Sequence, residues 1–262
     1  MAPIFLPDLR LNAEISGPEG GAPLVLVHAL GSSLVIWDDL LPLLPPGLRL
    51  LRLDLRGHGQ SDAPPGPYAM GALIRDTERL MDHFALKEAV ILGLSIGGLI
   101  AQGLAVKRLD LIRALILSNT AAKIGRPEQW QARIDSVRSG GLQAIHDATM
   151  ERWLGRRWRD SPALPRLSAL FLATRPDGWM GCAAAIAGSD FYETTATLTL
   201  PTLAIAGAND GSTPPDLVRE TAALIRGHRF ALIRGAGHIP MVEKPAEYAA
   251  LVTQFLAEIG HV

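Results

Sequence analysis

The chain reads AVILGLSIGG from residue 89 to residue 98, and this stretch decides the fold. Its first part is β-branched, its continuation is helix-like, and no charged residue occurs between residues 89 and 106. An uncharged run of 18 residues is at the lower limit for a membrane-spanning helix. The run contains Ser95, Gln102 and four glycines, however, which favour a buried strand that turns directly into a buried helix. We therefore predict a strand, a tight turn at Ser95 and then a helix.

Apolar runs of the same kind recur along the chain, each bounded by turn residues. They are continuous rather than alternating, which is typical of strands buried on both faces in a parallel sheet. The expected strands are residues 24–28, 48–54, 89–94, 114–119, 202–206 and 229–234, and the expected helices are residues 71–84, 97–107, 216–225 and 245–259. Residues 4–16 have the pattern of an antiparallel edge hairpin. The alternation predicts an α/β fold with a mostly parallel central sheet and helices on both faces.

The pattern changes between residues 121 and 199, where no strand-like run occurs. This stretch has the pattern of helices interrupted by glycine and proline, and it contains four of the five tryptophans: Trp130, Trp153, Trp158 and Trp179. We predict that residues 1–121 and 199–262 form one α/β core. Residues 122–198 are then a helical cap inserted into that core, not an independent domain. Extra crossover helices are the alternative interpretation.

The composition limits the classes of function. The chain has 262 residues with 25 Lys and Arg against 26 Asp and Glu, so its formal net charge is −1. This balance argues against a nucleic-acid binder or a polybasic membrane-surface protein, because both need a basic excess. We expect a small-molecule substrate and neither a nucleic-acid nor a membrane partner, and the oligomeric state stays open.

Two features favour a reducing, cytoplasmic compartment. Cys182 is the single cysteine, so the chain has no internal disulfide framework. The N-terminal sequence lacks a basic region followed by an apolar stretch, and we therefore expect no secretory signal.

Ser95 is the candidate nucleophile because of its place in the motif Gly-x-Ser-x-Gly, residues 93–97. A nucleophilic serine has to project from a strained turn between a strand and a helix, and glycines on both sides let the backbone pass closely. The hydroxyl then lies at a helix N-terminus, where developing negative charge is favoured. The alternative is a glycine-rich turn with an incidental serine.

A serine hydroxyl needs a base, and the base needs an acid that orients it. For this architecture the expected order along the chain is serine, acid, histidine. Asp210 follows one predicted strand and His238 follows the next, so both are expected at the carboxyl edge of the sheet, where ligands of α/β proteins bind. Asp216 is better explained as an acid in the first turn of a helix. The other histidines break the order or lack the loop context.

Backbone N–H groups are the expected stabilisers of an oxyanion. One should belong to Ile96, directly after the nucleophile, and the other to Leu30, in the loop after an early strand. Residues 54–61 (DLRGHGQS) are dense in polar groups, but we interpret them as a tight structural loop. No phosphate-binding loop, metal-ligand cluster or dinucleotide fingerprint occurs, and we expect no cofactor and no metal.

Together these residues resemble the α/β-hydrolase fold, and the cap resembles one family in particular, the 3-oxoadipate enol-lactonases. The resemblance is carried by residues 64–68 (PPGPY), 118–125 (SNTAAKIG), 130, 132–134 (ARI), 140–141, 151–153 (ERW) and 177–190. It implies hydrolysis of 3-oxoadipate enol-lactone to 3-oxoadipate in the breakdown of aromatic compounds, through an acyl-serine and without a cofactor.

The substrate of that family carries a free carboxylate, so the resemblance also implies a cation that binds it. Arg133 is three residues after Trp130, which puts both on one face of a helix. We expect these two residues and Trp153 to bind substrate, and Arg152 is the other candidate cation. A carboxylesterase or another lactonase with a less polar substrate is the alternative function. A binding module of the same fold is a third hypothesis.

Overall fold

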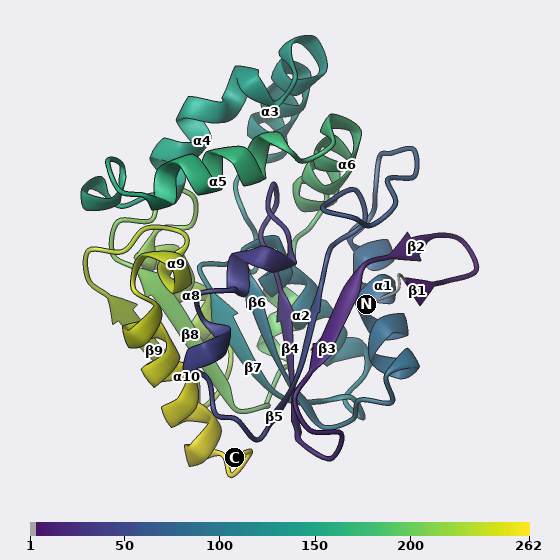
Figure 1. Ribbon diagram of the computed structural model, residues 1–262, viewed down its shortest axis with the longest axis vertical. Coiled ribbons are helices and arrows are strands. Elements are labelled where there is room, and N and C mark those ends of the chain that lie inside the picture. Colours follow the sequence, from purple (N-terminus) through teal and green to yellow (C-terminus); the bar gives the residue numbers. More distant parts are fainter. Residues whose placement is uncertain (1–3) are drawn as a thin grey trace.

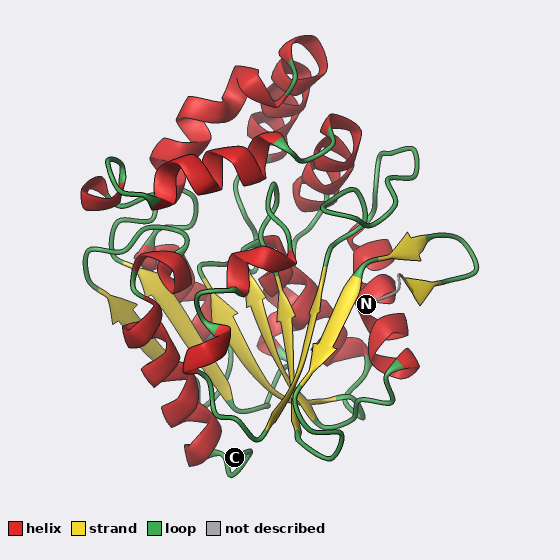
Figure 2. Cartoon of the chain, in the orientation of Figure 1, coloured by secondary structure: helices red, strands yellow, loops and turns green. Residues whose placement is uncertain are grey.

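The computed structural model describes residues 4–262 and has a central sheet of seven strands with helices on both faces (Figures 1 and 2). Six strands are parallel and the edge strand β3 is antiparallel to its neighbour β5. In spatial order the strands are β3 (Ala13–Ser16), β5 (Leu48–Leu53), β4 (Ala22–Val27), β6 (Ala89–Leu94), β7 (Ile112–Ser118), β8 (Thr202–Gly207) and β9 (Arg229–Ile233). The predicted α/β fold and its mostly parallel sheet are confirmed.

The continuous apolar runs form the centre of this sheet. Every residue of β6 and β8 is buried, which explains why neither strand alternates between apolar and polar residues. Strand β6 passes into helix α2 (Ile96–Lys107) through Ser95, so the stretch that first suggested a membrane span is a buried strand and a buried helix. Within residues 4–262, none of the helices combines the length and the apolar character that a membrane crossing requires.

The prediction of an edge hairpin over residues 4–16 is wrong in its details. Strands β1 (Ile4–Phe5) and β2 (Arg10–Leu11) pair in a small sheet of their own, and β3 joins the main sheet instead. The break between them falls at Asn12. Its N–H donates to Ser61 Oγ and its carbonyl accepts from Asp54 N–H, both at 2.9 Å, so the loop after β5 separates the two sheets.

Helices α1 (Met70–His83) and α2 lie behind the sheet in the view of Figure 1, and α10 (Pro245–Glu258) lies in front of it. Helix α8 (Pro215–Ala223) connects β8 to β9, and the short helix α9 (Pro240–Glu243) precedes α10. Two 3₁₀ helices, η1 (Leu34–Trp37) and η2 (Leu41–Leu43), follow β4.

Between β7 and β8 the chain forms helices and no strand. They are α3 (Pro127–Gly140), η3 (Leu142–Ile145), α4 (His146–Trp153), η4 (Arg156–Trp158), α5 (Ala163–Leu172), α6 (Pro176–Ala187) and α7 (Tyr192–Ala196). Figure 1 shows α3, α4, α5 and α6 above the carboxyl ends of the parallel strands. We call these four the cap helices. They cover the edge of the sheet at which ligands of open α/β sheets bind.

Candidate active site

Ser95 lies in a strained turn between β6 and α2. Its backbone has φ 58° and ψ −117°, a conformation that an L-residue rarely adopts, and its N–H donates to Ser118 O at 3.0 Å. A Cβ at Gly93 would lie 2.2 Å from Gly97 O, and a Cβ at Gly97 would lie 2.2 Å from Val27 O. Both glycines are therefore required by the close approach of the backbone at this turn.

Asp210 and His238 lie in the loops that follow β8 and β9. His238 Nδ1 is 2.8 Å from Asp210 Oδ2, and because a carboxylate only accepts, Nδ1 carries the proton. Both side chains are buried, at 2% and 0% exposure. This geometry fixes the tautomer of His238 and leaves Nε2 as its free basic nitrogen.

Asp210 also accepts hydrogen bonds from two other side chains and from two backbone N–H groups. Asn119 Nδ2 donates to Oδ2 at 2.8 Å and Thr213 Oγ1 donates to it at 2.7 Å, while Ser212 N–H and Thr213 N–H reach Oδ1 at 2.7 and 3.0 Å. Burial by itself would raise the pKa of Asp210. The positive charge of His238 and the hydrogen bonds outweigh burial, so the pKa of Asp210 lies below its usual value.

The roles of Asn119 and Thr213 were not predicted from the sequence. Asn119 has a positive φ of 46° directly after β7, at the carboxyl end of a strand that the sequence did predict. A polar residue at that position is the signal that could have identified it. Thr213 lies three residues after Asp210, and no pattern in the sequence distinguishes it from an ordinary loop threonine.

The loop that carries Leu30 is held by two buried histidines. Gly31 N–H donates to His58 Nε2 at 2.9 Å, and Leu55 N–H donates to His28 Nε2 at 3.0 Å. Burial lowers the pKa of His58 to about 3, with help from His28, and lowers that of His28 to about 4. Both rings are neutral at pH 7 and act as hydrogen-bond acceptors, which agrees with a structural role for residues 54–61.

The N–H groups of Leu30 and Ile96 donate to no other group in residues 4–262. Ile96 is the first residue of α2, so its N–H belongs to the helix N-terminus that has no partner within the helix. Both residues lie beside Ser95, one in the lining of the same cavity and one next in the chain. Two backbone donors are thus available close to the serine.

Ser95 and His238 open into a small cavity of about 50 Å³ under the cap helices. Of the residues singled out by sequence, Leu30, Trp130, Arg133, Arg152 and Trp153 also line it. Asp210 is not part of the lining, because it lies behind His238. Ile124, Thr149, Phe171, Trp179 and Ser212 complete the lining and were not predicted. Aromatic rings therefore form much of the wall, and Trp158 is not among them.

Two arginines of the cavity have no acidic partner within residues 4–262. The guanidinium of Arg133 lies 4.8 Å from the ring centre of Trp130, and Arg152 Nη2 donates to Thr149 Oγ1 at 3.1 Å. Burial lowers the pKa of Arg133. Burial and the neighbouring charge of Arg133 lower the pKa of Arg152 to about 10. These shifts mean that both charges lack compensation, which an anionic ligand would supply.

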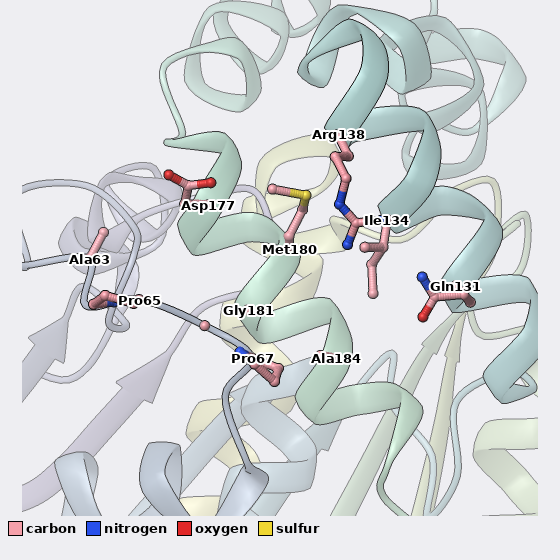
Figure 3. Close-up of a pocket in the computed structure, with 11 residues that line it drawn as sticks. Ala63, Pro65, Pro67, Gln131, Ile134, Arg138, Asp177, Met180, Gly181 and Ala184 are labelled. Carbon is pink, nitrogen blue, oxygen red and sulfur yellow. The ribbon is translucent and has the colours of Figure 1, made fainter.

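A larger pocket of about 570 Å³ lies between α3 and α6 (Figure 3). It is bounded by α3, α6 and the loop that contains Pro65 and Pro67, and it contains Gln131, Ile134 and Arg138. Neither Ser95 nor His238 reaches it. Residues 4–262 also contain no cluster of three His, Cys, Asp or Glu side chains suited to a metal ion. The chemistry of this chain is therefore to be sought in the smaller cavity.

The parallel sheet, the strained serine after β6 and the paired aspartate and histidine after β8 and β9 define an α/β hydrolase. The sequence profile of the Alpha/beta hydrolase family matches residues 24–251, and the chain belongs to this family. It is an enzyme of the hydrolase class.

The comparisons with individual proteins confirm the resemblance to enol-lactonases. The 3-oxoadipate enol-lactonase 2 of Acinetobacter baylyi is 32% identical, over 92% of this chain and 91% of that protein. The crystal structure of the enol-lactonase from Burkholderia xenovorans superposes with a TM-score of 0.94 at 32% identity and covers 98% of this chain and 100% of that one. A thermophilic esterase from Thermogutta terrifontis, studied with malate bound, has a TM-score of 0.90 at 29% identity over 97% of this chain and 95% of that one.

Proposed function

We propose that this chain hydrolyses a small carboxylated lactone through an acyl-serine, and that the substrate is 3-oxoadipate enol-lactone. The observation that carries the proposal is a cavity in which Ser95 and His238 face two arginines that lack an acidic partner. The similarity to proteins named enol-lactonases supports the choice of lactone.

Ser95 is the proposed nucleophile and His238 the general base. Oγ of Ser95 attacks the lactone carbonyl carbon while its proton passes to Nε2 of His238, and Asp210 stabilises the imidazolium that forms. The oxyanion receives hydrogen bonds from the N–H groups of Leu30 and Ile96. Each such donor typically contributes about 3–4 kcal/mol to lowering the barrier.

The ring then opens as the bond between the carbonyl carbon and the ring oxygen breaks. His238 returns its proton to the leaving oxygen, which departs as an enol and tautomerises to the ketone. Water, deprotonated by His238, hydrolyses the acyl-serine, releases the second carboxylate and restores Ser95. The product is 3-oxoadipate, an intermediate of aromatic-compound breakdown, and no metal or organic cofactor takes part.

Charge supports an anionic substrate. Arg133 and Arg152 supply the positive charge that a substrate carboxylate requires, and the guanidinium fork suits that group. Trp130 and Trp153 supply apolar walls for the ring. The structure of the esterase relative has malate, a small dicarboxylic acid, bound.

A carboxylesterase with a neutral substrate is the alternative, favoured by the esterase relative. The test follows the decrease in the ultraviolet absorbance of the enol-lactone with purified enzyme and compares it with the slow uncatalysed reaction. We expect rapid turnover by the wild type and none above background by Ser95→Ala. Turnover that survives in Ser95→Ala would refute the acyl-serine mechanism, and no turnover by the wild type would refute the substrate.

Arg133→Met separates the two substrate classes. Loss of a hydrogen bond between charged groups costs about 1.5–3 kcal/mol, so KM for the enol-lactone should rise by about 10- to 100-fold while a neutral aryl acetate is hydrolysed as before. Arg138→Met is the matched control, because Arg138 lies on the same helix but lines the larger pocket, which neither Ser95 nor His238 reaches. An equal loss with both substrates would contradict a role for Arg133 in carboxylate binding.

A further inference from the structure

The end of α4 is joined by backbone hydrogen bonds to the loops that carry His238 and Asp210. His238 N–H donates to Trp153 O at 2.7 Å, and Gly211 N–H donates to Arg152 O at 3.1 Å. We call the packing of residues 152–155 against residues 235–238 the cap–loop contact. This contact places Arg152 and Trp153, which line the cavity, directly against the loop that carries His238.

The side chain of Glu243 lies at the centre of this contact. One carboxylate oxygen accepts the N–H of Gly155 at 2.8 Å and the other accepts the N–H of Gly237. Glu243 comes from α9, an element outside both segments, and only 2% of it is exposed. A single buried carboxylate therefore connects the cap to the residue directly before His238.

The two glycines show how closely the segments approach. A Cβ at Gly237 would lie 2.4 Å from Trp153 O, and a Cβ at Gly155 would lie 2.8 Å from Gly235 O. No side chain separates the two backbones, so a shift of one displaces the other. Glu243 supplies the acceptors that their facing N–H groups would otherwise lack.

We propose that Glu243 is a positioning residue, whose carboxylate holds His238 and the cavity wall at Trp153 in the arrangement needed for hydrolysis. The inference rests on the role of His238 under Proposed function. A displacement of about 1 Å at a reacting group can cost up to about 100-fold in rate, which sets the scale of the effect.

The surroundings of Glu243 make this contact sensitive to pH. Burial raises the pKa of Glu243 to about 7, although the hydrogen bonds from Gly237 and Gly155 act in the opposite direction. The charge of Asp210 also raises this pKa, and the charge of His238 lowers it. The other charged groups nearby are engaged or exposed, apart from Arg152, whose side chain lines the cavity. Lys244 pairs with Glu247 and Arg159 with Glu151, and Arg156 and Arg157 of η4 are exposed. Protonation of Glu243 below about pH 7 therefore weakens its two bonds.

The first experiment compares wild type with Glu243→Gln from pH 5.5 to 8.5 on the enol-lactone and on p-nitrophenyl acetate. At pH 8.5 we expect kcat to fall by about 10- to 100-fold and KM to change by less than about threefold. The ratio of wild-type to variant kcat/KM should shrink severalfold toward pH 5.5, because protonated Glu243 in the wild type is then as uncharged as the glutamine of the variant.

Glu247→Gln is the control, because Glu247 is exposed on α10 and pairs only with Lys244. It should match wild type at every pH. A ratio for Glu243→Gln that stays constant with pH, or a loss confined to thermal stability with unchanged kcat, would overturn the proposal.

A second measurement needs neither a variant nor turnover. In ¹⁵N-labelled wild type, the amide proton of Gly155 should move upfield as the pH falls, with a midpoint near 7, because its acceptor loses its charge. A Gly155 signal that stays constant between pH 5.5 and 8.5 would overturn the charged contact even if the enzyme proves inactive on both substrates. Inactivity of the wild type would count against the proposed function alone.

Discussion

The substitution Thr213→Val tests how the fold keeps a buried carboxylate ionised. Thr213 Oγ1 donates to Asp210 Oδ2 at 2.7 Å in a fully buried site, and valine replaces the hydroxyl by a methyl group of similar size. The donors from Asn119, Ser212 N–H and Thr213 N–H remain. The change therefore removes one hydrogen bond from the charge and leaves little cavity behind.

The size of the effect follows from the charge on the acceptor. A hydrogen bond to a charged group contributes about 1.5–3 kcal/mol, roughly twice the value for neutral partners. The pKa of Asp210 should therefore rise in the variant. Above pH 5 we expect the free energy of unfolding to fall by about 1.5–3 kcal/mol.

The pH dependence carries a definite sign. The pKa of Asp210 in the folded chain lies below the value of about 3.9 for an unfolded aspartate. Ionised Asp210 therefore stabilises the fold above about pH 3.9, and this stabilisation is lost as the pH falls through the folded-state pKa. Because Thr213→Val has already lost part of it, the difference from wild type should shrink toward low pH.

Urea unfolding followed by tryptophan fluorescence, at pH 2.5 and pH 7.5, measures the difference directly. The control is Thr197→Val, because Thr197 is exposed and donates only to a local carbonyl, and it should stay within about 0.5 kcal/mol of wild type. A Thr213→Val variant as stable as wild type at pH 7.5, or equally destabilised at both pH values, would refute the reasoning.

Three further substitutions test other parts of the site. Gly97→Ala places a Cβ 2.2 Å from Val27 O and should lower the free energy of unfolding by about 1–3 kcal/mol. An unchanged urea midpoint would contradict the close approach. His58→Leu leaves the N–H of Gly31 without its acceptor, and we expect a similar loss of stability. It should also lower kcat by a factor that does not vary with pH between 5.5 and 8.5, because the His58 ring is neutral throughout that range. Arg152→Met should raise KM for the enol-lactone at least fivefold and leave p-nitrophenyl acetate hydrolysis unchanged; equal effects on both would exclude a charge role.

The fold could be predicted from the sequence because its strands are unusually easy to recognise. Strands β6 and β8 are buried along their whole length, so each is a continuous apolar run that ends in a chemically distinctive loop. Parallel strands align their carboxyl ends, and this alone indicates that Ser95, Asp210 and His238 share one edge. The edge hairpin was harder, because Asn12 bonds to a loop about 40–50 residues away in the chain.

The rest of the site depends on distances that no local pattern encodes. Asn119 bonds to Asp210 across 91 residues, and Glu243 bonds to Gly155 across 88. Arg133 was accessible to prediction since its helical spacing from Trp130 persists in the structure as a stacked pair. The proximity of Arg152 to Arg133 was not, because η3 and the turn at Gly141 lie between their helices.

The direction of the pKa shift distinguishes buried arginines that are paired with acids and stabilise the fold from buried arginines that lack such a partner. Burial acts on Arg52 too, but hydrogen bonds from Arg52 to Asp38 and Glu14 outweigh it and raise its pKa, so ionised Arg52 stabilises the folded chain. Arg133 and Arg152 show the opposite shift because no acid compensates their burial. Two uncompensated cations in one cavity lower stability, and a fold does not need them for packing. The same pair becomes favourable once an anion lies between them, and for this reason we propose that these two charges select a carboxylated substrate.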